Sequence, residues 1–160
     1  MEIEKKYLVQ KIPEGLEEAE KWEISQGYLC TLENAPTIRI RRVNNTYILT
    51  YKSRAGVKQE RDVIVNQEEE LPITRECFEH LAEKVDGRLI QKTRYRFPIG
   101  IRDTAELDIF HGELEGLHLV EVEFSTVQDA KDFVAPKWFG KDVSDDKRFR
   151  NSSLAMSNLK

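Results

Sequence analysis

The sequence predicts an α+β chain that is mainly β: a closed eight-stranded antiparallel β-barrel forming a tunnel, with helices packed on its outside. Two observations predict it. First, eight stretches alternate between apolar and polar residues, and most are joined by short turns, which favours antiparallel pairing. Second, seven of these stretches have a charged face on which one sign of charge dominates. Eight strands are enough to close a barrel, whose lumen would then hold the charged faces.

The N-terminal half supplies five predicted strands and two predicted helices. Residues 12–23 place apolar side chains at helical spacing, so Trp22 is expected to pack on the apolar face of a helix. Asn44-Asn45 is a hairpin turn signal, because asparagine tolerates positive φ. Apolar residues at helical spacing predict a second helix over 73–85, ended by Gly87. The predicted strands are residues 2–11, 24–31, 37–43, 46–52 and 58–66.

The C-terminal half repeats this pattern with three strands, at 88–99, 104–110 and 117–124. Thr126 is placed to cap a short helix, and residues 147–159 are expected to form a final helix. Trp138 lies in the loop APKWFGK, where packing is the expected role. The helices at 12–23, 73–85 and 147–159 would cover the apolar outer faces of the strands.

Charged side chains recur at every second position of the predicted strands. One face of an antiparallel sheet normally meets water, so a single charged face needs no function. Same-face neighbours are about 6.5–7 Å apart, however, and like charges at that spacing repel. Repetition over seven strands therefore indicates a ligand that carries both charges. The charged faces are Glu2, Glu4 and Lys6; Arg39 and Arg41; Thr50 and Lys52; Lys58, Glu60 and Asp62; Lys92, Arg94 and Arg96; Glu106 and Asp108; Glu121 and Glu123.

Composition excludes several classes of function. The chain has 160 residues, enough for the single domain expected over residues 1–160, and its formal net charge of −4 argues against a nucleic-acid partner. It contains no apolar run of membrane-spanning length, and a charged N-terminus argues against a signal peptide. Cys30 and Cys77 are far apart, as expected of free thiols in a reducing cytoplasm. The three histidines lack zinc-ligand spacing.

These residue types suit phosphoryl chemistry. An arginine holds phosphate oxygens in pairs and a lysine acts as a point charge. Mg²⁺ is bound by a few carboxylates together with substrate phosphates. Phosphoryl transfer needs positioning and charge neutralisation more than covalent help. The sequence lacks a glycine-rich phosphate loop ending in Gly-Lys-Ser/Thr and a dinucleotide fingerprint.

The order of these motifs resembles the CYTH superfamily, also called the triphosphate tunnel metalloenzymes. Its Glu-x-Glu-x-Lys signature corresponds to residues 2–6, and the likeness extends from residue 2 to about 155. The closest resemblance is to small bacterial members that hydrolyse inorganic triphosphate. The further matching motifs are Arg39-x-Arg41, Lys52, Glu60, Lys92-x-Arg94, Glu106-x-Asp108, Glu121-x-Glu123 and the tail DKRFRNSSLA.

The resemblance implies a role for each matching residue, with tripolyphosphate as substrate and Mg²⁺ as cofactor, replaceable by Mn²⁺. Metal ligands would be Glu2, Glu4, Glu121 and Glu123, with Glu2, Glu4 and Glu123 the preferred trio. Glu106 and Asp108 would bind a second metal or orient the attacking water. Substrate would be held by Lys6, Arg39, Arg41, Lys52, Lys92 and Arg94. One basic residue of the tail, Lys147, Arg148 or Arg150, is expected near the tunnel, with Arg148 preferred.

Three other functions stay open. An adenylate cyclase of class IV type needs the same metal and triphosphate groups, so the motifs do not separate it from a hydrolase. A non-catalytic polyphosphate-binding module would need no water-activating acids, yet the sequence retains them. A structural barrel whose charges only satisfy one another would be costly, because unpaired buried charges cost several kcal/mol each. Oligomeric state and the physiological substrate are not encoded in any of these patterns.

Overall fold

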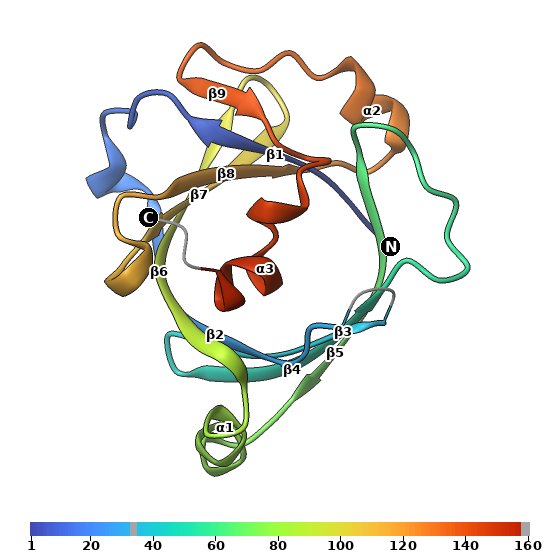
Figure 1. Cartoon of the computed structure of the whole chain (residues 1–160). Helices are drawn as coiled ribbons and strands as arrows, with labels where there is room; N and C mark the ends of the chain where they lie inside the picture. Colours follow the sequence, from blue (N-terminus) through green and yellow to red (C-terminus); the bar gives the residue numbers. More distant parts are fainter. Residues whose placement is uncertain (33–34, 158–160) are drawn as a thin grey trace.

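The computed structural model describes residues 1–32 and 35–157. Within them, nine strands form one antiparallel sheet in the order β5-β4-β3-β2-β6-β7-β8-β1-β9. A further pairing between β5 and β1 closes eight strands into a barrel (Figure 1), which confirms the predicted fold class. The strands are β1 (Glu2–Val9), β2 (Glu20–Cys30), β3 (Thr37–Val43), β4 (Thr46–Ser53), β5 (Ile64–Pro72), β6 (Asp86–Ile99), β7 (Asp103–Phe110), β8 (His118–Glu123) and β9 (Phe139–Asp142).

The strand register carries one charged face around the whole barrel. Side chains alternate between the two faces of a strand, and residues paired across strands share a face. Lys6 of β1 lies opposite Glu121 of β8, which lies opposite Glu106 of β7. Arg94 of β6 in turn lies opposite Asp108 of β7. These charged positions therefore face the lumen, as the alternation predicts.

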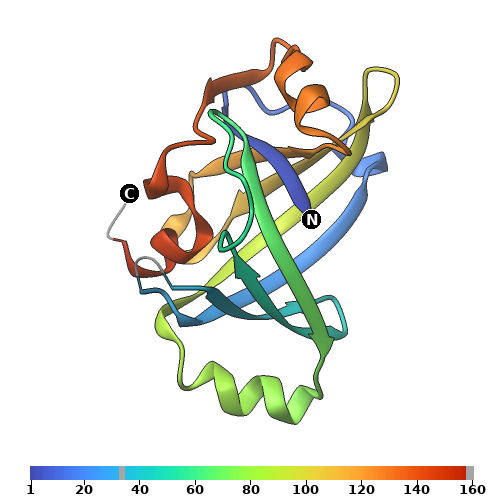
Figure 2. The ribbon, with the colours of Figure 1, turned by 90° about the vertical axis from the view of Figure 1, so that its right-hand side faces the viewer.

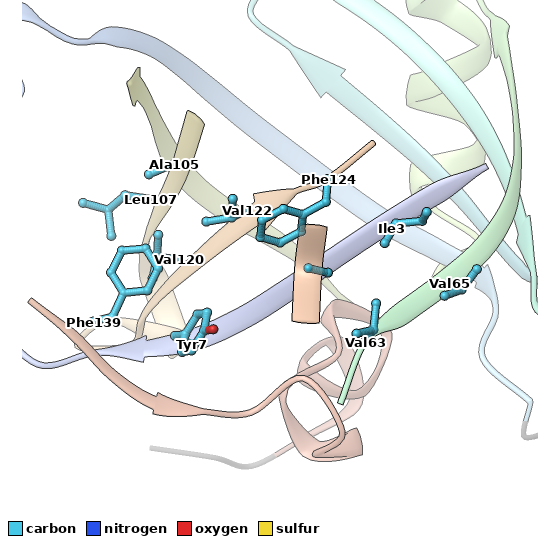
Figure 3. Close-up of a cluster of buried hydrophobic side chains, with 11 residues drawn as sticks. Ile3, Tyr7, Val63, Val65, Ala105, Leu107, Val120, Val122, Phe124 and Phe139 are labelled. Atoms are coloured by element: carbon cyan, nitrogen blue, oxygen red, sulfur yellow. The ribbon is translucent and has the colours of Figure 1, made fainter. Parts of the chain in front are cut away.

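The opposite, apolar face of β1, β7 and β8 is buried outside the barrel. Figure 3 shows this cluster, in which Ile3, Val65 and Val122 project from the wall toward β9 and its flanking chain. Tyr7 stacks at a ring distance of 5.0 Å on Phe139 of β9. Each fully buried aliphatic or aromatic side chain contributes roughly 1.5–3 kcal/mol. This outer cluster holds the charged wall in shape without relying on the charges themselves.

A second apolar cluster fills one end of the lumen. Tyr28, Ile90 and Phe110 stand on the same inward faces as the charged residues and meet Leu154 of the C-terminal segment. This segment forms a 3₁₀ turn at Lys147–Phe149 and helix α3 (Asn151–Met156). Figures 1 and 2 show α3 lying across one opening of the barrel. The tunnel therefore has one end closed by apolar packing.

The remaining helices lie on the outside, as predicted. Helix α1 (Arg75–Ala82) falls within the predicted 73–85 segment and begins at Thr74, whose hydroxyl accepts a hydrogen bond from the Cys77 amide. Phe78 of α1 packs on Tyr47 of β4 at a ring distance of 5.4 Å. Helix α2 (Val127–Asp132) is capped by Thr126 as expected. Helix α3 differs, because it covers the opening rather than the outer wall; Leu159 lies outside the described residues.

Two sequence-based element assignments are wrong. Residues 12–23 do not form a helix: only Leu16–Glu18 makes a 3₁₀ turn, after Gly15 at φ 83°, and β2 starts at Glu20. The segment 58–66 is mostly loop, and strand β5 runs from Ile64 to Pro72 instead. The charged face assigned to Lys58, Glu60 and Asp62 is therefore outside the tunnel; Glu60, for example, pairs with Lys131 on the surface.

Three smaller expectations can be compared with the structure. Trp138 packs against Phe97 and Phe139, with ring distances of 5.7 and 4.5 Å, which confirms its packing role. Cys30 and Cys77 are both free thiols. Within the described residues, no helix has the length and apolar composition needed to cross a membrane.

Candidate functional site: a two-signed tunnel

The lumen of the barrel contains a cavity of about 880 Å³ lined mainly by polar and charged side chains. All eight strands of the closed barrel contribute side chains to the wall of this cavity, so no single loop or helix defines it. The side chains of the wall stand on paired strands, and the apolar packing on the outside of the barrel holds those strands in place. Among its residues are Glu2, Glu4, Lys6, Trp22, Tyr28, Arg39, Arg41, Thr50, Lys52, Asn66, Glu68, Glu70, Lys92, Arg94, Glu106, Glu121 and Glu123.

Three arginines form a crowded basic group in the wall. Burial, then repulsion from Arg39 and Arg94, lowers the pKa of Arg41 to about 10. In the part of the chain that the structure describes, the buried Nε atoms of Arg39 and Arg41 have no hydrogen-bond partner, although Arg39 Nη2 donates to Thr50 Oγ1 at 3.2 Å. Buried polar groups are almost always paired, so two orphaned guanidinium N–H groups in a cavity indicate an anionic ligand.

Acidic side chains gather on the β1–β5–β8 part of the wall. Burial, then repulsion from Glu121 and Glu2, raises the pKa of Glu4 well above its usual range. Burial acts on Glu121 in the same direction, but attraction to Lys6 and Arg94 outweighs it and lowers the pKa of Glu121. Burial, then Glu2, then Glu106, raises the pKa of Glu123. At Glu4 and Glu123, burial and the neighbouring carboxylates together therefore outweigh the nearby bases, whereas at Glu121 the bases prevail.

A lysine bridges two acidic strands beside this group. Lys52 Nζ lies 3.0 Å from Glu2 and 3.5 Å from Glu68, so it links β4 to its neighbour β5 and, across β5, to β1. Asn66 Nδ2 also donates to Glu2, at 3.4 Å. Glu2 and Lys52 were expected to have separate ligands, a metal and a phosphate, and in this structure they neutralise each other.

Asp108 is on the inward face of β7 but is buried beneath the cavity lining, and both of its oxygens are occupied. Arg94 donates to Oδ1 at 2.7 Å and to Oδ2 at 2.9 Å, and Lys92 Nζ lies 2.8 Å from Oδ2. Burial alone would raise the pKa of Asp108, but Arg94 and Lys92 outweigh it and lower that pKa. Burial lowers the pKa of Lys92 to about 8, against the attraction of Asp108. This geometry favours a positioning role for Asp108 over metal binding.

The C-terminal segment reaches the tunnel bases from the closed end. Lys6 Nζ donates to the Phe149 carbonyl at 3.1 Å, and Lys92 Nζ donates to Asn151 Oδ1 at 3.2 Å. Lys147 and Arg150 line the cavity. The preference for Arg148 is wrong: its side chain is 70% exposed and forms a two-pronged pair with Asp146. A run of basic residues in a tail does not reveal which one turns inward.

Several wall residues were missed from the sequence. Glu68 and Glu70 occupy the inward face of β5, because that strand starts later than predicted. The sequence does contain a signal for Glu68 and Glu70. Val63 and Val65 are apolar and face outward, so the residues between and after them at every second position, starting from Ile64, must face inward. Tyr28 and Trp22 were missed because the inward face of β2 is aromatic and uncharged.

The acids fit a divalent cation in kind, although they are not assembled around one. Among the described residues, no three carboxylate, histidine or cysteine side chains already converge at metal-ligand distances. The mutual repulsion around Glu4 and Glu123 is nevertheless what a bound cation would relieve, and carboxylate oxygens suit Mg²⁺ or Mn²⁺. A cation bound by Glu2 would compete with Lys52 for that carboxylate.

Comparison with known proteins agrees with this geometry. The model of the CYTH domain matches residues 1–153. The chain belongs to the CYTH family. A protein of Nitrosomonas europaea named inorganic triphosphatase is 39% identical over 156 residues, covering 98% of this chain and 97% of the relative. One of Acetivibrio thermocellus with the same name is 32% identical, with 99% and 96% covered.

Solved structures give the same result. A crystal structure described as an inorganic triphosphatase has a TM-score of 0.72 at 38% identity, and the match covers 98% of this chain and 95% of that one. CYTH triphosphatases are generally metal-dependent. The resemblance inferred from the order of the motifs is thereby confirmed.

Proposed function

We propose that this protein is a metal-dependent inorganic triphosphatase that hydrolyses tripolyphosphate. The observation that carries the proposal is the pair of buried, unpartnered guanidinium N–H groups of Arg39 and Arg41 in a cavity that also holds facing carboxylates. A triphosphate satisfies the former, and a divalent cation neutralises the latter. The names of the two bacterial relatives support the same substrate.

The bases of the wall would hold the three phosphates. Arg39 and Arg41 offer planar forks to phosphate oxygens, and Lys6, Lys52 and Lys92 add point charges. Arg94, whose Nε and Nη2 already bind Asp108, adds its positive charge. The bidentate grip of Asp108 on Arg94 fixes the guanidinium before substrate arrives. Lys147 or Arg150, rather than Arg148, would add charge from the C-terminal segment. Holding the reacting groups in position before the reaction is a main way in which a protein accelerates phosphoryl transfer.

The acids would hold Mg²⁺ and prepare the water. Glu2, Glu4, Glu121 and Glu123 are the proposed carriers of the ion, with Mn²⁺ as a substitute. The ion, when bound, neutralises charge on the phosphates. Glu106 would accept a hydrogen bond from a water molecule and orient it toward the terminal phosphorus. Water adds to that phosphorus, the bond to the bridging oxygen breaks, and orthophosphate and pyrophosphate leave with release of the water proton.

Product analysis tests this function. Purified protein with Mg²⁺ is expected to convert tripolyphosphate into equal amounts of orthophosphate and pyrophosphate, to act more weakly on ATP, and to lose activity with EDTA. Colorimetric phosphate release and ion chromatography measure these products. Cyclic AMP formed from ATP would point to a cyclase instead, and the absence of phosphate release from any triphosphate would contradict the proposal.

Ligand binding alone should stabilise the fold. At a tripolyphosphate concentration of 100 times Kd, we expect about 2.7 kcal/mol of added stability, because only the native barrel assembles the bases. For a domain of this size that is about 5–11 °C in Tm by thermal denaturation. Orthophosphate at equal ionic strength is the control. An unchanged Tm would favour a barrel whose charges serve only one another.

We also infer a reducing, cytoplasmic location. The two thiols, Cys30 and Cys77, are unpaired and belong to different parts of the fold. Free cysteines persist where thiols are kept reduced.

A further inference from the structure

Arg96 is an inward-facing base of β6 to which neither the motifs nor the proposed function assigns a role. It lies in a row of paired residues, opposite Glu20 of β2 on one side and opposite Glu106 of β7 on the other. The cavity wall within the described residues includes Trp22 and Glu106 but not Arg96. Arg96 therefore lies next to the cavity, beside the residues that line it.

Three contacts fix the Arg96 guanidinium. Its Nε donates to Glu106 Oε2 at 3.1 Å, and its Nη1 lies 3.5 Å from Glu20 Oε2. Its Cζ lies 4.8 Å from the centre of the Trp22 ring, and the Trp22 indole donates to Glu20 Oε1 at 2.9 Å. Arg96, Trp22 and Glu20 therefore each contact the other two, and Glu106 contacts Arg96. A planar guanidinium can bind two carboxylates and stack on an indole at once, whereas an ammonium cannot.

The contact to Glu106 matters because of where that carboxylate lies. Arg94 Nη1 also approaches Glu106 Oε2, at 3.6 Å, so both arginines use the same oxygen and leave Oε1 outside these contacts. Glu106 is also close enough to repel Glu123. Without the positive charge of Arg96 beside it, Glu106 would increase the repulsion within the acidic group. Arg96 thus provides a cation on the side of Glu106 that faces away from Glu121 of β8.

We propose that Arg96, supported by Trp22, is a positioning residue that holds Glu106 in the orientation needed to direct the attacking water. The proposal rests on the proposed function, because it names the residue through which one catalytic group is fixed. Arg96 does not touch the substrate. It acts through Glu106 alone, and Trp22 supports it by stacking against the guanidinium.

A double-mutant cycle tests this role. Arg96→Gln is expected to lower kcat for tripolyphosphate about 10-fold and change KM less than threefold. The same change in a Glu106→Gln background should have an effect below twofold, because its target is gone. Arg102→Gln is the matched control: Arg102 binds Asp129 at 3.0 Å but is 72% exposed, outside the barrel. Arg96→Lys should not rescue kcat.

An unchanged kcat in Arg96→Gln, or an equal loss with and without Glu106, would overturn the proposal. A rise in KM at constant kcat also overturns it, because that pattern indicates direct phosphate binding. Two readouts do not require turnover. Calorimetric titration with Mn²⁺ should show half-saturation at a concentration at least threefold lower in Arg96→Gln, since a cation near the acids is removed.

The second readout is the Tm, measured without ligand, of wild type, Arg96→Gln, Glu106→Gln and the double variant. The Tm shifts of Arg96→Gln and Glu106→Gln should be non-additive, and additive shifts would overturn the proposal. If wild-type protein releases no phosphate, the proposed function fails, while the Mn²⁺ and Tm cycles still decide whether Arg96 positions Glu106.

Discussion

Arg41→Ala is expected to reduce kcat/KM for tripolyphosphate by roughly 10²–10³-fold while leaving Tm unchanged or higher. Arg41 is buried among Arg39 and Arg94, and burial together with their repulsion lowers its pKa to about 10. Its Nε has no hydrogen-bond partner among residues 1–32 and 35–157. The side chain therefore destabilises the unliganded barrel and is useful only when an anion is bound. Activity and stability should consequently change in opposite directions.

The neighbouring residue on the same strand provides the control. Arg42 faces outward, where it donates to the Asn44 carbonyl at 2.7 Å and lies over the Tyr47 ring. Arg42→Ala should leave kcat/KM within twofold of wild type. Steady-state phosphate release and thermal denaturation measure both variants. A large drop in Tm with normal activity in Arg41→Ala would contradict the assignment of Arg41 to the tunnel.

The sequence predicts the barrel because most of its strands alternate cleanly. In residues 38–41 and 120–123, charged and apolar residues alternate, so the register of the charged face can be derived without coordinates. Strand β5 was misplaced because its segment NQEEELP has three successive acids, so the outward Glu69 hides the inward phase of Glu68 and Glu70. Periodicity fails where both faces of a strand are polar.

Two other differences arise from tertiary contacts. Trp22 belongs to an aromatic inward face of β2, and its spacing from Leu16 and Ala19 imitates a helix by coincidence. The position of α3 depends on Leu154 entering the lumen beside Ile90 and Phe110, a contact that no local pattern encodes. The motif residues were thus predictable, whereas the closed end of the tunnel and the pairing of Asp108 required the structure.

Asp108→Asn is expected to cost about 3–5 kcal/mol in the free energy of unfolding without ligand, because it leaves two buried cations without their partner. Lys92 and Asp108 have side chains only 1% exposed, and Arg94 is 9% exposed. The folded-state pKa of Asp108 is lowered, so its stabilisation is present above the unfolded-state pKa of about 3.9 and is lost as pH falls through the folded value.

The size of this loss should depend on pH in a second way. Burial lowers the pKa of Lys92 to about 8, and Asp108 is the largest influence raising it. In Asp108→Asn that pKa falls further, so Lys92 loses its proton at lower pH and stops being an unpaired charge. The deficit relative to wild type should therefore be larger at pH 6 than at pH 9. Urea denaturation at the two pH values measures it.

The metal dependence of the same variant separates two roles for Asp108. A positioning residue that fixes Arg94 should, when changed to Asn, lower kcat while the half-activating Mg²⁺ concentration stays within twofold. A metal ligand would instead raise that concentration 10-fold or more. Asp103→Asn, on the outward face of the same strand, is the control and should match wild type in both measurements. Both oxygens of Asp108 already bind cations of the protein, so the positioning outcome is the expected one.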